Sequence, residues 1–494
     1  MHLLMVIIAV SVFVWWLWIR MKPRHKLPPI YPGGLPLLGN VLQLPSNTTD
    51  LWKLEKEVYE YVLKGDGVVL LTAFMFRYYV ITDPDDALLV ANACLEKPYL
   101  YNFGKEMYQK GLLMSDVSLW KPHRKLLNPA FNQQVMNSFL DIFNDQARAL
   151  VTELTAEVGK EVIDFETYFT NNILKTTCRT TLGLNIDEDN SIIKKYVIAT
   201  KHLFETYVQR TIKYRLHFES IFNLSSLKKT QDRLVKTLKG ISTEVIRRRI
   251  EKKRDTKNDL GDATVPDKFE PLLDQMLHLA DTSGSFTVDE IQDHVNTTIA
   301  AAFDTTSKNF LFDLILIGSH NDVQARIIQE LNEVFEGDDR NVTKSDLQKL
   351  VYLEAVIKES LRLYPPGPRI LRYIDSDIKL KKYTLQAGST CIISIHAINR
   401  HPMWGADADQ FRPERWLDPA SLPDNRNAFA SFSLGRRNCI GKAYAMMIAK
   451  TTLVHILRNY HITSTSHDLQ TRCDVLQAPV EGHKIKIQPR KLIN

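Results

Sequence analysis

Cysteine is scarce in this sequence. Only five of the 494 residues are cysteines, and no two of them form a C-x-x-C pair. An odd number of scattered cysteines argues against a disulfide framework and is typical of a chain in a reducing compartment. No group of cysteine and histidine residues has the spacing of a zinc site. The five are Cys94, Cys178, Cys391, Cys439 and Cys473.

A strong excess of charge of one sign is also absent. The formal net charge is +6 over 494 residues, without a long basic tract. We therefore expect no nucleic-acid partner. A mildly basic face is compatible with an anionic membrane surface or an acidic partner protein. No internal repeat is present, and a hydrophobic content of 44% is enough for a large buried core.

The sequence has one long hydrophobic run, and it lies at the N-terminus. Residues 3–19 read LLMVIIAVSVFVWWLWI, a run long enough to cross the hydrocarbon core of a bilayer. Tryptophans close the run, and the basic residues from Arg20 to Lys26 predict a cytosolic flank. A cleaved signal peptide is the alternative, but the run lacks a basic segment before it and an Ala-x-Ala site after it. We therefore predict an uncleaved membrane anchor over residues 1–20.

Proline and glycine are concentrated just after this run. The stretch KLPPIYPGGLPLLGN has a composition that favours a stiff linker over a helix. We assign residues 21–40 to a basic and proline/glycine-rich linker that holds the body at a fixed angle to the membrane. Residues 41–494 are then one large domain on the cytosolic side.

Helical spacing of apolar residues dominates this domain. Helices are predicted over residues 51–63, most of 141–254, Thr287–Ile317, Ser345–Leu363 and the segment after Gly441. Strands are predicted within Gly67–Pro84 and Ile378–Ser394. The charged stretch Lys252–Lys268 has the composition of a mobile surface loop. The predicted fold class is mainly α with a minor β portion.

A long irregular stretch, Arg400–Ser433, leads into the decapeptide FSLGRRNCIG. Loops of this length are usually functional. Cys439 stands just before a predicted helix, where backbone N–H groups and the helix dipole stabilise a thiolate. Gly435 and Gly441 remove side-chain bulk and permit unusual backbone angles, so a large flat group could lie against the loop. Arg437 could neutralise an anionic group on it.

One thiolate in this setting suits the iron of a haem. The alternative is a buried structural cysteine in a glycine-containing turn. At this point the sequence resembles a known family, because the decapeptide matches F-x-x-G-x-R-x-C-x-G at every fixed position. That is the signature of the cytochrome P450 haem-thiolate monooxygenases. The resemblance implies haem b, bound through the Cys439 thiolate, with further contacts from Phe432, Gly435, Arg437 and Gly441.

Two other segments resemble haem-contacting motifs of this family. WKPHR matches W-x-x-x-R, so Trp120 and Arg124 share one face of a helix. By resemblance both reach a haem propionate, whereas alone the segment would be an exposed amphipathic turn. Arg372 lies where relatives place another propionate-binding arginine.

The predicted helix Thr287–Ile317 carries AAFDTTS, which is similar to the family's (A/G)-G-x-(D/E)-T-(T/S). The resemblance implies that Asp304 and Thr305 deliver protons during catalysis. A helix-bending threonine is the structural alternative. Ala302 replaces the usual glycine, so the oxygen pocket is expected to be tighter. Ala301 stands where relatives that esterify haem have glutamate, so covalent attachment by that route is not expected.

Two motifs predict a structural ionic triad. KESLRLYPP matches E-x-x-R, which places Glu359 and Arg362 within reach on one helix. FRPERW resembles the family's P-E-R-F. By resemblance Arg415 joins Glu359 and Arg362 and fixes the loop beneath the haem. Taken alone, such pairs are common surface features.

The resemblance implies the cytochrome P450 fold and a monooxygenase of the animal microsomal type, on the insect side of the fatty-acid hydroxylase clan. One oxygen atom would enter a lipophilic substrate, and the other would leave as water. The substrate classes implied are fatty acids, terpenoid or steroid hormones and foreign compounds. The chain would be a single-pass protein of the endoplasmic reticulum membrane.

Electrons would come from NADPH through a membrane-bound NADPH–cytochrome P450 reductase, with cytochrome b5 as a second donor. Arg436 and Lys442 could face an acidic partner, and ordinary surface charge is an equally good account of them. One rival function is a same-fold isomerase or dehydratase of oxygenated lipids that needs no reductase. The Asp304–Thr305 pair argues against it. The other rival is a non-catalytic membrane protein that binds haem or lipid. The sequence does not specify the substrate.

Overall fold

A computed structural model describes most of the chain, namely residues 8, 11–12, 26–160, 165–184, 190–260, 270–464, 469–480 and 485–490. The predicted anchor over residues 1–20 therefore lies outside the described residues, apart from Ile8, Ser11 and Val12. Among the residues that are described, no helix has both the length and the apolar character needed to cross a bilayer.

The described chain is mainly helical with small sheets, as the apolar spacing predicts. Its α-helices are α2 (Thr48–Lys64), α3 (Pro84–Ala93), α4 (Lys105–Tyr108), α5 (Val117–Leu127), α6 (Gln133–Ser138), α7 (Leu140–Leu154), α8 (Phe165–Thr177), α9 (Asn190–Ile212), α10 (Glu219–Asn223), α11 (Ser226–Leu260), α12 (Leu272–Ser283), α13 (Val288–Ser319), α14 (Asn321–Phe335), α15 (Lys344–Lys349), α16 (Val351–Leu363), α17 (Ile395–Ile398) and α18 (Lys442–Asn459).

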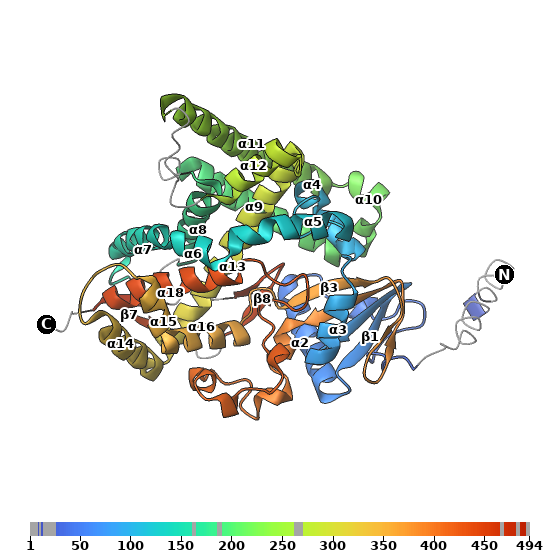
Figure 1. Ribbon diagram of the computed structural model, residues 1–494. Coiled ribbons are helices and arrows are strands. Elements are labelled where there is room, and N and C mark those ends of the chain that lie inside the picture. Colours follow the sequence, from blue (N-terminus) through green and yellow to red (C-terminus); the bar gives the residue numbers. More distant parts are fainter. Residues whose placement is uncertain are drawn as a thin grey trace.

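The strands form one sheet of four and three pairs. They are β1 (Val68–Ala73), β2 (Phe76–Ile81), β3 (Arg369–Ile374), β4 (Ile378–Lys379), β5 (Thr384–Leu385), β6 (Ser389–Ser394), β7 (Tyr460–Ser464), β8 (Thr471–Cys473), β9 (Gln477–Pro479) and β10 (Ile485–Pro489). The larger sheet has the order β1-β2-β6-β3, with β6 parallel to β2 and antiparallel to β3. It lies at one end of the molecule beside α2 and α3 (Figure 1). This sheet therefore joins the first and last thirds of the domain.

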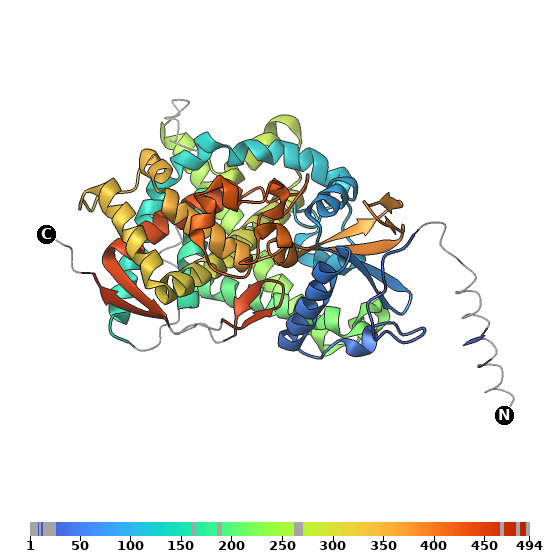
Figure 2. The same cartoon turned by 90° about the horizontal axis from the view of Figure 1, so that it is seen from below.

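The long helix α13 runs through the helical part of the molecule. It begins with a capping box, in which the Thr287 hydroxyl accepts the Glu290 backbone N–H and the Glu290 carboxylate accepts the Thr287 backbone N–H. It packs against α4, α8, α11, α12, α14, α16 and α18 (Figures 1 and 2). Because other elements surround it, most of its side chains are buried.

Two predicted boundaries are wrong. The predicted helix Ser345–Leu363 is two helices, because Leu350 between α15 and α16 has φ −77 and ψ 69, which is not helical. The predicted loop Lys252–Lys268 is helical over its first part, up to Leu260 of α11, and residues 261–268 lie outside the described residues. Charged residues such as lysine and arginine are good helix formers, and i,i+4 pairs such as Arg247–Glu251 support the helix.

Candidate active site

Cys439 lies between the irregular loop and the first turn of α18, whose N-cap is Gly441. Its backbone N–H donates to the Phe432 carbonyl at 2.9 Å, which closes the loop on itself. Packing around the sulfur raises the pKa of the Cys439 thiol, and the Gly441 N–H, Arg124 and Lys442 oppose that rise. The side chain is nevertheless exposed, whereas the other four cysteines are buried. A sulfur enclosed by protein but open on one side is suited to bind a group that is not part of the chain.

The two glycines of the decapeptide have different roles. Gly435 has a φ of +69, and a Cβ there would lie 2.9 Å from the backbone carbonyl carbon of Ala91. The loop can therefore pass this close to α3 only with glycine. Gly441 has an ordinary φ of −88, so the expectation of an unusual backbone angle is wrong at this position. A Cβ at Gly441 would lie 4.0 Å from the Cys439 sulfur.

Three cationic side chains gather near this loop. Among the described residues, Lys97, Arg372 and Arg437 have no ion-pair partner, and Arg372 Nε, Arg437 Nε and Arg437 Nη1 are buried donors without an acceptor. Burial, then repulsion from Arg372, lowers the pKa of Arg437 to about 10. Burial and both arginines hold the pKa of Lys97 well below its usual range. The buried arginine donors without acceptors point to an anionic partner outside the chain.

The W-x-x-x-R motif lies on α5 and makes two different contacts. The Trp120 ring centroid lies 4.6 Å from Arg437 Cζ, so Trp120 borders the cationic cluster. Arg124 instead donates to the Asn438 backbone carbonyl at 2.9 Å and to its side-chain oxygen at 3.1 Å. It also donates to Asn128 at 2.8 Å. Arg124 thus braces the residue before Cys439, a contact that its motif does not predict.

One face of α13 is open within the molecule. Ala301 is exposed, and Thr298, Ala302 and Thr305 are half-buried, whereas the residues around them on the helix are buried. Their spacing places them on one side of the helix. The Thr305 hydroxyl donates to the Ala301 carbonyl at 2.6 Å. A row of small side chains on a surrounded helix leaves room for another molecule beside it.

Asp304 does not share this open face. It is 5% exposed, and its Oδ1 lies 2.5 Å from Lys308 Nζ. Asp304 and Thr305 are adjacent in sequence but occupy different environments. The sequence motif predicts that both residues deliver protons, and it gives no sign of the lysine that holds the carboxylate.

The predicted ionic residues meet in the interior. Glu359 Oε1 accepts from Arg362 Nη2 at 2.8 Å and from Arg415 Nε at 2.8 Å, and all three side chains are 0% exposed. Burial alone would raise the pKa of Glu359, but Arg362 and Arg415 outweigh it and lower that pKa. Trp416 Nε1 also donates to Glu359 at 2.9 Å. These bonds join α16 to the irregular loop.

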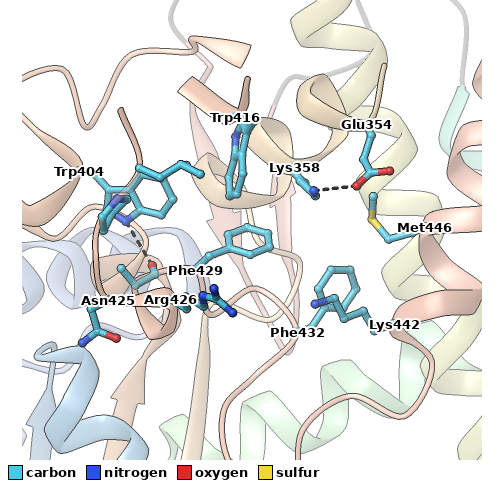
Figure 3. Close-up of a pocket in the computed structure, with 13 residues that line it drawn as sticks. Glu354, Lys358, Trp404, Trp416, Asn425, Arg426, Phe429, Phe432, Lys442 and Met446 are labelled. Atoms are coloured by element: carbon cyan, nitrogen blue, oxygen red, sulfur yellow. Dashed lines mark hydrogen bonds and ion pairs between the residues drawn. The ribbon is translucent and has the colours of Figure 1, made fainter. Parts of the chain in front are cut away.

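A groove of about 380 Å³ borders the same loop (Figure 3). Aromatic and cationic side chains line it: Trp404, Trp416, Phe429, Phe432, Lys358, Arg426 and Lys442. Lys442 Nζ lies 5.6 Å from the Phe432 ring centroid, and Lys358 pairs with Glu354 at 2.7 Å. Cations outnumber the single carboxylate of the groove. It is therefore a mixed apolar and basic surface next to the cysteine loop.

Sequence reasoning missed three residues of this region: Lys97, Lys308 and Trp416. Lys97 belongs to no motif and lies in a short segment without periodicity. Lys308 follows the AAFDTTS motif directly, and a lysine within so apolar a helix was the available signal. Trp416 stands where the family's P-E-R-F has phenylalanine, and the signal was its indole N–H, which can donate to a buried carboxylate.

The residues present fit haem b. The open sulfur of Cys439 is a suitable axial ligand, the unpaired donors of Arg372 and Arg437 suit carboxylates, and the small face of α13 leaves space for a substrate. No described cluster of three or more His, Cys, Asp and Glu side chains competes as a metal site.

Comparison with known proteins agrees with this arrangement. The cytochrome P450 family model matches residues 28–485. The chain is 31% identical to Cytochrome P450 4V2 of Mus musculus, over 96% of this chain and 91% of that protein. It is 28% identical to Cytochrome P450 4c21 of Blattella germanica, over 95% of each, and 27% identical to Cytochrome P450 4g15 of Drosophila melanogaster, over 97% and 96%. The chain belongs to the cytochrome P450 family, whose members bind haem b through a cysteine thiolate, and it is a monooxygenase of that family.

Proposed function

We propose that this monooxygenase acts on a fatty acid, a terpenoid or steroid hormone, or a foreign lipophilic compound at the endoplasmic reticulum membrane. The observation that carries this proposal is the open face of α13, where Ala301, Ala302 and Thr305 offer small side chains to a bound substrate. An apolar surface without charged groups favours a lipophilic molecule. Haem b, when bound, supplies the oxidative chemistry.

The roles of the chain's own residues follow from their positions. Cys439 supplies the anionic ligand, and the Gly441 N–H together with nearby Arg124 and Lys442 favours its thiolate form. Arg372, Arg437, Lys97 and Trp120 would bind and orient the carboxylates of the cofactor. Phe432, Gly435 and Gly441 shape the loop that carries the ligand.

Proton delivery falls to two residues of α13. The Thr305 hydroxyl holds a proton at the open face, where it now bonds the Ala301 carbonyl. Asp304 is the adjacent buried carboxyl group, and it can replace the proton that the Thr305 hydroxyl gives up. Because the two groups face different directions, a water molecule or a side-chain rotation has to connect them.

Membrane association is supported by exposed apolar side chains at one end of the domain. Leu37, Phe74, Met75, Phe218 and Leu224 are 60%, 48%, 86%, 66% and 88% exposed. The Phe74 and Tyr214 rings lie 6.0 Å apart, which brings the β1–β2 turn beside the segment that leads into α10. Figures 1 and 2 both place β1 and α10 at the same end of the molecule. Exposed apolar patches of this kind mark membrane or protein contacts.

A reductase partner is supported by the groove beside the cysteine loop. Lys442, Arg436 and Arg426 are exposed there, and they would complement an acidic donor protein. We propose NADPH–cytochrome P450 reductase as the principal electron donor and cytochrome b5 as a second one. Reduction of the protein by the reductase should slow as ionic strength rises.

The experiment that tests this function uses the haem-loaded full chain. Lipids and foreign compounds are screened for a low-spin to high-spin absorbance change, and products are then identified with reductase and NADPH present. Conversion that requires both reductase and NADPH supports the proposal. Conversion of an oxygenated lipid without NADPH would instead identify an isomerase or dehydratase. Ligand binding without any oxygen consumption would identify a carrier.

A further inference from the structure

A chain of ion pairs connects α13 to α8 and α9, and it is buried at its α13 end. Lys308 Nζ lies 2.5 Å from Asp304 Oδ1 and 3.9 Å from Glu166 Oε1. Glu166, on α8, also accepts from Lys201 Nζ of α9 at 2.8 Å. The side chains of Lys308 and Asp304 are only 11% and 7% exposed. The carboxylate of the proton-delivery motif is therefore part of an internal network that reaches two other helices.

Lys308 contacts Asp304 directly and can therefore fix the position of its carboxylate. The two residues are one helical turn apart, so α13 presents them on the same side. Burial alone would lower the pKa of the Lys308 ammonium, but the charges of Asp304 and Glu166 outweigh it and raise that pKa. Lys308 is therefore a permanent cation, and a buried cation of this kind keeps its carboxylate partner fixed.

The other groups near the pair do not replace Lys308. Arg472, on β8, is a more distant cation whose charge opposes that of Lys308. Tyr108, on α4, feels the negative charge of Asp304, which adds to burial in raising the pKa of its hydroxyl. That hydroxyl has no hydrogen-bond partner among the described residues. Lys308 is thus the cation in direct contact with Asp304.

We propose that Lys308 is a positioning residue for the monooxygenase reaction, which keeps the Asp304 carboxylate turned toward α8. This proposal rests on the proton-delivery role proposed above for Asp304. While Lys308 holds the Asp304 carboxylate, a proton can pass from Asp304 to Thr305 only through a connecting water molecule or after rotation of the Asp304 side chain. Lys308 thereby sets how fully electron use is coupled to substrate oxidation.

A purely structural role is the competing explanation, since Lys308 also links α13 to α8 through Glu166. A merely structural residue would affect folding but not the pH dependence of the reaction. The experiments below use K308M to remove the charge, K308R to keep it, and D304N to remove the partner.

The first experiment measures the melting temperature of the haem-loaded parent, K308M, K308R, D304N and K308M/D304N at pH 6 and pH 8. We expect K308M to lose stability, because it leaves the buried Asp304 carboxylate without the cation that contacts it. The double variant should recover part of the loss, and K308R should stay near the parent. Additive losses from the two single changes would show that the pair is not coupled and would overturn the proposal.

The second experiment measures product formed per NADPH consumed, as a function of pH, with the compound that the substrate screen identifies. We expect K308M to lower this ratio by up to about 100-fold, the lower range for a positioned proton-transfer group. The pH profile should also shift, and K308R should restore both quantities.

The two proposals fail in different ways. If D304N leaves the product ratio and its pH profile unchanged, the proton-delivery role of Asp304 is wrong, whatever the melting temperatures show. If D304N lowers the ratio but K308M matches the parent, Asp304 works without Lys308 and the present inference is wrong.

Discussion

Arg437 lies over the indole of Trp120, with its Cζ 4.6 Å from the ring centroid. Arg437 Nη2 also donates to the Ser115 backbone carbonyl at 2.8 Å, while its Nε and Nη1 have no acceptor in the described chain. The stacking leaves the guanidinium fixed in place with donors still free. Two motifs that are distant in sequence therefore meet, and they leave guanidinium donors without an acceptor among the described residues.

Replacing Arg437 with methionine should weaken haem binding. A charge-assisted hydrogen bond contributes about 1.5–3 kcal/mol, so we expect haem to dissociate roughly 10- to 100-fold more readily. Transfer of haem from the protein to an apo-haem acceptor measures this. Arg436→Met, an exposed neighbour, is the control. Equal losses in both variants would contradict the assigned role.

Replacing Cys439 with histidine should change the axial ligand. The absorbance maximum of the reduced carbon-monoxide complex should move away from that of the parent, because the thiolate is lost. Cys178→Ala serves as the control, because Cys178 is a free cysteine that is buried. An unchanged maximum in Cys439→His would mean that another residue holds the iron.

Glu359→Gln should destabilise the fold strongly. The change leaves Arg362 and Arg415 as buried cations without their carboxylate, which costs about 3–5 kcal/mol. Urea unfolding followed by circular dichroism measures the loss. Glu60→Gln breaks the exposed pair with Lys64 and should cost about 0–1 kcal/mol. Similar losses at the two sites would argue against a triad that holds the loop.

Gly435→Ala should destabilise the cysteine loop. A side chain at a φ of +69 is strained, and the new Cβ would press on the Ala91 carbonyl, so we expect a loss of about 1–3 kcal/mol. Gly240→Ala is the matched control, because it lies within α11 with open space around the added Cβ. Alanine there should stabilise the helix by up to about 1 kcal/mol. Thermal melts of both variants give the comparison.

Asp313 should make stability depend on pH. It is 0% exposed, and burial, partly offset by the Ser360 hydroxyl, raises its pKa from 3.8 to about 8. Between these values the folded chain holds a proton that the unfolded chain has lost. Stability therefore falls as pH rises through this window.

Asp313→Asn removes this proton uptake. Its stability relative to the parent should rise by about 1.4 kcal/mol per pH unit between pH 5 and pH 8. Denaturant titrations at several pH values measure the difference. A difference that stays constant with pH would show that Asp313 is ionised in the folded protein. Asp50→Asn, at the exposed start of α2, gives the baseline.

Local patterns predicted much of this architecture. The helix Thr287–Ile317, the hairpin within Gly67–Pro84 and the helix after Gly441 follow from apolar periodicity and from capping or turn residues near each boundary. The contact between Glu359 and Arg362 could also be predicted, because both residues lie on one helix, three positions apart. Motifs of fixed spacing thus predict which residues share an element.

The sequence could not predict contacts between elements that are distant along the chain. Nothing near Arg124 indicates that Asn438 accepts its hydrogen bonds, and nothing near Lys97 places it beside Arg372. The break at Leu350 has no proline or glycine beside it that would have signalled it. These features arise from tertiary packing, which one chain's local pattern does not encode.

The pairing of β2 with β6 has a consequence for synthesis of the chain. The hairpin of β1 and β2 leaves the ribosome early, but its inner edge stays without a neighbour until residues 389–394 emerge. An unpaired edge strand is a site of unwanted association during that interval. Folding of this end of the protein must therefore wait for translation to near completion, and a nascent chain that stalls earlier would require a chaperone to keep that edge covered.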